Sequence, residues 1–129
     1  MRIEDHWAKA KRLEATRSRK LDTRTDHEIV IWSCIHGGAH LANVILHRLG
    51  VTEDSFDLIH SDIPDLNRAV PPEAAAMLAT LKSIETLGPR FVRGIEPPDP
   101  ATMKACLAAY NKVKAFAEKL LRQQKGKRR

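Results

Sequence analysis

Three histidines lie in a segment that is otherwise largely apolar, the run IHGGAHLANVILHRLG at residues 35–50. His36 and His40 are one helical turn apart, a spacing that lets two imidazoles reach the same metal ion. His47 lies about 10 Å beyond His40 along a helix, too far to join that ion easily. A third ligand would come from another element, and the sequence offers His6, His27, His60 and Asp62. The pattern indicates a divalent metal site on His36 and His40, and no other cofactor.

The same residues also fit a purely structural role. On a helical wheel the three histidines fall within about 40° of one another, at the edge of an apolar face. Asn43 lies between them and the centre of that face. Polar side chains at such a boundary usually form hydrogen bonds with groups of the core. Both interpretations stay open, and the candidate binding residues of this helix are His36, His40, Asn43 and His47.

Two arginines form a second candidate binding feature. Arg90 and Arg93 flank Phe91 near the end of the third expected helix. Two guanidinium groups there could bind an anion beside the histidines, because guanidinium pairs well with phosphate and carboxylate. The alternative is a pair of solvated loop side chains.

The net charge of +6 is concentrated at the two ends of the chain. Residues 1–20 carry 7 basic and 3 acidic groups, and residues 122–129 carry 5 basic groups and no acid. Basic ends could contact RNA or another polyanion through its phosphates. They could equally be a solvated helix surface and a frayed terminus.

Helical periodicity dominates the chain and predicts four helices. Their expected ranges are 2–20, 25–49, 71–87 and 101–124. Thr25 and Glu28 have the spacing of a capping box at the start of the second helix, and Gly50 is placed to end it. Residues 51–72 are expected to form a loop or a short helical turn, and the proline-rich residues 88–100 a connector.

Four amphipathic helices without a strand pattern predict an all-α fold, a four-helix up-and-down bundle. Residues 1–124 are expected to form a single domain, and residues 125–129 a basic tail. The N-terminus mixes acids and bases where a signal peptide would need an apolar segment. No run of consecutive apolar residues approaches the roughly 18 needed to cross a bilayer. We therefore expect a cytoplasmic protein that does not bind a membrane.

The second helix is apolar nearly all round, which is typical of a helix buried on several sides. Its main apolar face holds Ile31, Trp32, Ile35, Ala39, Ala42, Leu46 and Leu49. Gly37 and Gly38 weaken a helix by about 1 kcal/mol each relative to alanine. Close approach of another element would offset this cost. We expect that element to be a neighbouring helix or a second copy of the chain, and we predict a homodimer through this helix.

The run AHLANVIL at residues 39–46, followed by Gly50 and Val51, resembles the second helix of HEPN domains. The later order also fits: a loop with a histidine, an alanine-rich helix, a proline-rich break and a long final helix. The resemblance extends over residues 27–121, although its specific part is this short segment. HEPN domains are small helical bundles, commonly dimeric. Many are RNases, and others bind nucleotides or act as scaffolds.

The RNases of this family use an arginine followed four to six residues later by a histidine. Neither Arg90 nor Arg93 is followed by a histidine at that distance, so catalysis is not carried over. The resemblance implies a HEPN-like binding or interaction module for nucleotide or RNA, more a binding protein than an enzyme. The alternatives are a metal-dependent helical-bundle enzyme using His36 and His40, and a protein-interaction bundle in which every histidine is structural.

Overall fold

The computed structural model describes residues 1–19, 26–58 and 69–127, with side chains up to Gln123. Within these residues every regular element is helical and no strand occurs, which confirms the predicted all-α class. The elements are α1 (Ile3–Arg17), α2 (His27–Arg48), α3 (Pro72–Glu85), η2 (Gly88–Val92) and α4 (Pro100–Lys127). Helix α4 extends past the expected boundary at residue 124, so the backbone of residues 125–127 is helical.

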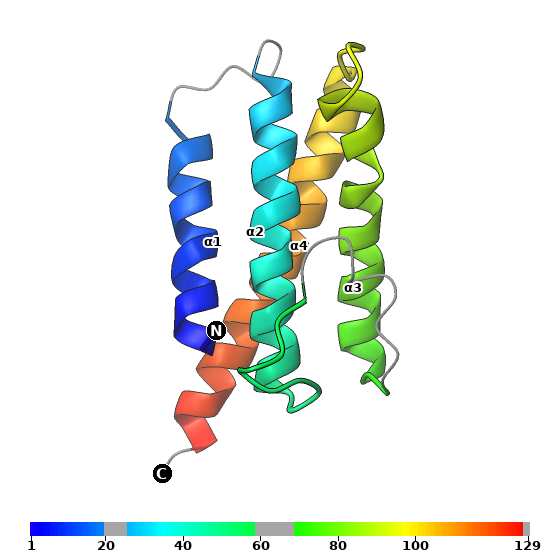
Figure 1. Ribbon diagram of the computed structural model, residues 1–129. Helices are drawn as coiled ribbons and strands as arrows, with labels where there is room; N and C mark the ends of the chain where they lie inside the picture. Colours follow the sequence, from blue (N-terminus) through cyan, green and yellow to red (C-terminus); the bar gives the residue numbers. More distant parts are fainter. Residues whose placement is uncertain (20–25, 59–68, 128–129) are drawn as a thin grey trace.

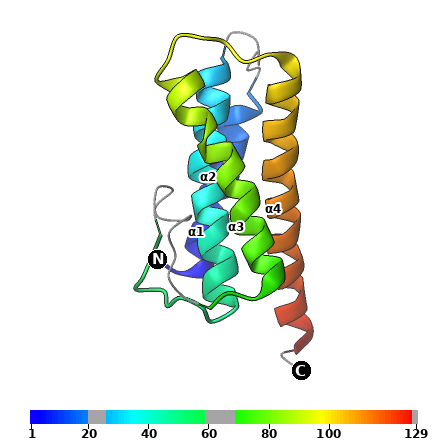
Figure 2. The same ribbon diagram turned by 90° about the vertical axis from the view of Figure 1, so that its right-hand side faces the viewer.

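The four long helices lie side by side and run alternately up and down (Figure 1). Helix α2 contacts α1, α3, α4 and η2, so it is the central helix, as its composition indicates. The turned view in Figure 2 shows α3 and α4 on one side of α2, with α1 behind it. Most side chains of α2 are therefore buried against another element.

The ends of the helices follow local sequence signals. Gly50 has φ 74°, the left-handed conformation that glycine adopts without strain, and it terminates α2. Pro72 occupies the first turn of α3, where its missing N–H costs nothing. Asp26 occupies the N-cap position of α2 without a side-chain capping bond, and Thr25 of the expected capping box lies outside the described residues.

The connector after α3 is more regular than its prolines suggest. Gly88–Val92 forms one turn of π-helix, η2, and the amide of Arg93 donates to the Gly88 carbonyl at 3.0 Å. Phe91 is buried within this turn and belongs to the core. Because Phe91 packs inward, the turn closes the upper end of the bundle against α2 (Figure 2).

Helices α3 and α4 each bury one apolar face, made of Ala74, Met77, Leu78, Leu81 and Ile84 on α3 and of Met103, Cys106, Tyr110, Val113 and Ala117 on α4. Helix α2 buries both its main face and the opposite one, which includes Val30, Leu41 and Val44. Trp32 departs from this pattern, because its residue surface is 47% exposed, and Leu49 is exposed as well. The other helices therefore cover only part of the apolar face expected on α2, and Trp32 and Leu49 lie outside the covered part.

The two glycines of α2 bring neighbouring side chains close to its backbone. A Cβ on Gly37 would lie 2.9 Å from the Tyr110 hydroxyl oxygen, and a Cβ on Gly38 would lie 2.7 Å from Leu81 Cδ2. The close approach expected at this pair is thus made within one chain, to α4 and α3. The pair needs no second copy of the chain to explain it, and the homodimer stays a prediction.

Tyr110, which packs against Gly37, also forms a hydrogen bond. Its hydroxyl donates to Glu14 Oε2 at 2.7 Å, and Lys114 Nζ donates to Glu14 Oε1 at 2.6 Å. Burial alone would raise the pKa of Glu14, but the bonds from Lys114 and Tyr110 lower it. Because Glu14 belongs to α1 and its partners to α4, this network joins the two helices beside the middle of α2, where Tyr110 packs against Gly37.

Helix α2 is long and apolar enough to cross a membrane by length and mean hydropathy. However, 78% of its most apolar 18-residue window is buried inside the protein. That degree of burial is typical of the core helix of a bundle.

Gly37→Ala is expected to destabilise the protein by about 1–3 kcal/mol, although alanine favours a helix. The added methyl displaces the Tyr110 ring, which cannot move without stretching its bond to Glu14. Gly38→Ala is the matched control, because its new methyl meets only the flexible end of Leu81, and we expect a smaller loss. Urea unfolding followed by circular dichroism at 222 nm measures both. Equal effects would contradict the role assigned to Tyr110.

Candidate metal centre

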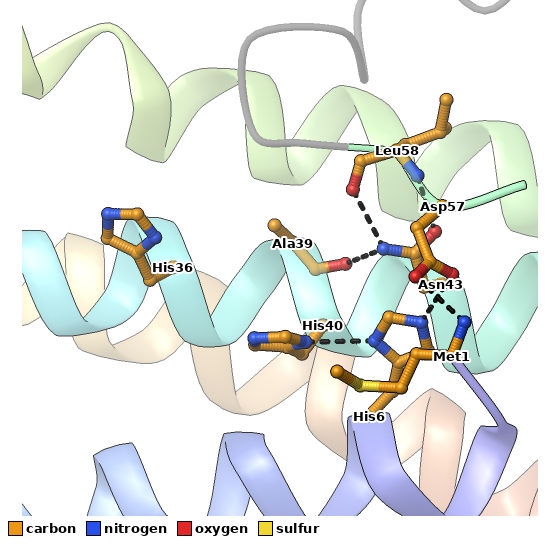
Figure 3. A pocket seen from close by; sticks show the side chains of 8 residues that line it. All are labelled: Met1, His6, His36, Ala39, His40, Asn43, Asp57 and Leu58. Carbon is orange, nitrogen blue, oxygen red and sulfur yellow. Dashed lines mark hydrogen bonds and ion pairs between the residues drawn. The ribbon is translucent and has the colours of Figure 1, made fainter.

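A pocket of about 360 Å³ opens between α1, α2 and the segment after α2 (Figure 3). It is lined by Met1, His6, His36, Ala39, His40, Asn43, Asp57 and Leu58. This volume lies at the lower end of the range for sites that hold small molecules. The pocket brings together histidines from two helices and a carboxylate from a loop.

The centre of the site is Asp57, whose Oδ1 accepts hydrogen bonds from two histidines. His6 Nε2 lies 2.8 Å from this oxygen and His47 Nε2 lies 2.9 Å from it. The side chains of His6 and His47 are 2% and 0% exposed, whereas that of Asp57 is 35% exposed. The two imidazoles are therefore in the core, and the carboxylate connects them to the pocket.

The second nitrogen of each buried ring also has a partner. His47 Nδ1 lies 2.7 Å from Thr52 Oγ1, and His6 Nδ1 lies 2.8 Å from His40 Nδ1. Every nitrogen of His6 and His47 is thus used, and both rings are fixed in orientation.

The positions of these side chains follow from helix geometry. His40 and His47 are seven residues apart, two helical turns, so they project from the same face of α2. His6 is on the buried face of α1 and fills the gap between them, with ring centroids 5.1 Å from His40 and 5.2 Å from His47. His40 and His47 are too far apart to contact each other directly. His6 of α1 lies between them and contacts both rings.

Asn43 holds the loop that carries Asp57. Its Nδ2 donates to the carbonyl oxygens of Leu58 and Ala39, at 2.8 Å and 3.0 Å, and its Oδ1 accepts from the Leu58 amide at 2.9 Å. A buried asparagine that pairs with both backbone groups of one residue behaves like a short piece of β-ladder. It fixes residue 58, and therefore the direction in which Asp57 projects.

The protonation states follow from burial and partners. Burial would raise the pKa of Asp57, but hydrogen bonds from the Met1 amine and from both histidines bring it well below its usual range. Burial lowers the pKa of His6. Burial also lowers the pKa of His40 to about 4, and the neighbouring positive charges act in the same direction. At neutral pH the site therefore holds an ionised Asp57 and neutral rings at His6 and His40, and ionised carboxylates and neutral imidazoles are the forms that bind metal ions.

The structure separates the two histidines expected to share an ion. His36 lies in the wall of the pocket, apart from the group around Asp57, and its ring meets the Trp32 ring edge-on at 4.2 Å (Figure 3). His40 contacts His6 instead. Among the described residues the group with metal-ligand geometry is His6, His47 and Asp57, whose ligand atoms all lie within 4.8 Å of one another.

The two arginines lie away from this pocket. Arg90 is exposed and forms an ion pair with Glu96 at 2.8 Å. Arg93 lines a separate, smaller pocket of about 140 Å³ beside Trp32.

Two of the residues expected as a third metal ligand, His60 and Asp62, lie outside the described residues. Of the two candidates that the structure describes, His6 reaches the site, whereas His27 is in the first turn of α2.

Sequence reasoning did not single out Asp57 or Thr52. Both lie in the segment after α2, where no periodicity indicates which side chains turn inward. The sequence signal that could have found them is their closeness to His47 along the chain. A chain that reverses direction at Gly50 passes back beside the C-terminal end of α2.

Comparison with known proteins leaves the function to be inferred from this geometry, because no protein-family model, curated protein or solved structure matches the chain.

Asn43→Ala is expected to destabilise the protein by about 2–3 kcal/mol, because it leaves two buried backbone groups of Leu58 without partners. The matched control is Asn111→Ala on the exposed face of α4, which should change stability by less than about 0.5 kcal/mol. Urea unfolding gives both values. Limited proteolysis should also cut the Asp57 segment faster in Asn43→Ala, and unchanged cleavage would show that Asn43 does not hold this loop.

Proposed function

We propose that this protein binds a divalent transition-metal ion through His6 Nε2, His47 Nε2 and Asp57 Oδ1, and presents that ion to the adjacent pocket. The observation that carries the proposal is the convergence of two buried imidazoles on one carboxylate oxygen. These three ligand atoms come from α1, α2 and the loop after α2, so only the folded chain assembles them.

The spacing of the ligand atoms suits a metal ion. An ion bound about 2.0–2.2 Å from each ligand requires those ligands to be roughly 3–3.5 Å apart. The present N···O separations of 2.8 and 2.9 Å need to widen only slightly for an ion to replace the two N–H protons. Two imidazoles and one carboxylate form a ligand set typical of Zn²⁺ and of non-haem Fe²⁺.

The outer contacts support the same proposal. Metal-binding histidines usually donate their other N–H to a second group, which fixes the ring and raises its basicity. His47 has Thr52 in this position and His6 has His40. Both partners are in place in the described structure, so the rings are already held close to the orientation that an ion would need.

Three protein ligands leave at least one coordination position open. The exposed side of Asp57 faces the pocket, so an incoming group would reach the ion from there. Structural zinc sites are closed by four protein ligands, whereas sites that act on a substrate keep a position for water or substrate. The geometry therefore favours a site that binds a further ligand over one that only stabilises the fold.

His47→Gln and His6→Gln are expected to abolish binding of about one Zn²⁺, Fe²⁺ or Co²⁺ per chain. Thr52→Val should weaken binding about tenfold or more, because it removes the outer partner of His47. Metal content by mass spectrometry of untagged protein and Co²⁺ titration followed by absorbance measure these changes. His36→Gln is the control and should retain the ion.

Two results would contradict the metal proposal. One is a wild-type protein that takes up no metal at micromolar concentrations. The other is loss of the ion in His36→Gln with retention in His47→Gln, which would return the site to the pair of residues 36 and 40. Circular dichroism of each variant separates loss of the ligand from loss of the fold.

A second proposal, a HEPN-like module that binds nucleotide or RNA, rests on the resemblance of residues 39–51. One observation favours it: His40 and Asn43, which both lie in that segment, line the pocket. Under this proposal metal-free protein binds a fluorescent oligoribonucleotide or ATP, and His40→Ala weakens that binding. Fluorescence anisotropy tests this, and binding that is absent from metal-free protein would leave the metal proposal alone.

A further inference from the structure

The two cysteines of the chain lie in the core, on neighbouring helices and away from the group around Asp57. Cys34 belongs to α2 and is fully buried, and Cys106 belongs to α4 and is 3% exposed. Both are free thiols in the structure. The metal proposal uses neither of them.

The packing of α2 against α4 brings the two thiols to the same level of the bundle. Both helices run from the upper to the lower end in Figure 1, so residues that face each other keep a nearly constant offset in number. Tyr110 of α4 packs against Gly37 of α2. Lower down, the Arg48 guanidinium donates to the Leu120 carbonyl at 3.1 Å. Nearly the same offset relates the two cysteines, which lie about one turn before the first of these contacts.

The two thiols form a side-chain hydrogen bond, in agreement with this register. The bond lowers the pKa of Cys34, while the same bond and burial raise the pKa of Cys106. Cys106 is therefore the donor, and Cys34 is the thiol that ionises first.

Charged neighbours also act on Cys34. Arg17 of α1 is held beside it by a hydrogen bond from its Nη1 to Ser33 Oγ at 3.1 Å, and its positive charge lowers the pKa of Cys34. Burial and the charge on Glu14 act in the opposite direction. Because the thiolate is the nucleophilic form of cysteine, Cys34 is the member of the pair equipped to react first.

We propose that Cys34 and Cys106 form a peroxide-sensitive dithiol that closes to a disulfide between α2 and α4. The Cys34 sulfur attacks one oxygen of hydrogen peroxide, the O–O bond breaks, and Cys34 becomes a sulfenic acid with release of one water. The Cys106 sulfur then attacks the sulfenic sulfur. The S–S bond forms, and the sulfenic oxygen leaves as a second water with the Cys106 proton. The two thiols are oxidised by two electrons, and the peroxide is reduced to two waters.

Burial determines which oxidant can act and how fast. A small peroxide can reach the pair when the helices part transiently, whereas a bulky disulfide such as oxidised glutathione is excluded. Oxidation is therefore expected over minutes to hours. The product joins two helices that are far apart in sequence, and a disulfide that closes a long loop makes unfolding less favourable.

The test treats full-length protein with hydrogen peroxide in the presence of a chelator, which prevents metal-catalysed oxidation. The protein is then denatured, alkylated and digested, and its cysteine peptides are identified by mass spectrometry. Wild type should lose both free thiols together and yield a peptide pair linked through Cys34 and Cys106. Its thermal midpoint should rise by about 10 °C or more and return to the starting value after reduction with dithiothreitol.

Two matched variants test the order of the steps. Cys106→Ser removes the resolving thiol, so Cys34 should accumulate as a sulfenic acid that dimedone labels. Cys34→Ser leaves Cys106 without its activated partner, and labelling there should be about tenfold slower or more. Circular dichroism at 222 nm checks that both variants keep the fold.

Three outcomes would overturn the proposal. The first is wild-type protein that keeps both thiols free after prolonged exposure to peroxide. The second is oxidation of each cysteine to separate acids without a linked peptide pair. The third is labelling of the two single variants at equal rates, which would remove the role given to Cys34. The wild-type measurement involves no substitution, so it decides the matter even if a variant fails to fold.

Discussion

The shared hydrogen bonds at Asp57 Oδ1 are the interaction on which the lower half of the bundle depends. His6 and His47 are buried so completely that water cannot satisfy their nitrogens. A buried polar group without a partner costs about 1–3 kcal/mol, so the carboxylate that serves both rings determines where the loop after α2 must lie. The same oxygen joins α1, α2 and that loop, and it places a negative charge at the edge of the pocket.

The burial of most of the surface of α2 explains why such a network arises. Several polar side chains of this helix find partners in the core, each in a different way. Ser33 accepts from Arg17 of α1, Asn43 pairs with the backbone of Leu58, and His47 reaches Thr52 and Asp57. Gly37 lets Tyr110 approach closely enough for its hydroxyl to reach Glu14. Gly37 and Gly38 allow close packing near the middle of the helix. His40 and His47 form polar contacts with other elements nearer its C-terminal end.

The helices were predictable because their signals are local. Periodicity located α1 to α4 within a few residues, and Gly50 and Pro72 end and begin helices as their backbone preferences require. The face of α2 that carries His40 and His47 was predictable too. Which residues face them was not, because His6 and Asp57 come from other elements and helical spacing contains no information about a neighbour. The exposure of Trp32 was missed for the same reason, since a wheel shows which residues share a face but not how much of that face is covered.

A stable bundle does not require this site. Buried polar networks are often matched or exceeded in stability by apolar side chains of similar size, so stability alone is a weak reason for three histidines and an acid at one place. A closed network would account for His6, His47 and Thr52, whose hydrogen-bonding atoms are all paired. It would not account for His40, which extends the chain of contacts into the pocket, or for a carboxylate whose Oδ1 serves two buried rings and which is still 35% exposed. These two features lead from the core to the pocket, as expected of groups that bind and orient a ligand there.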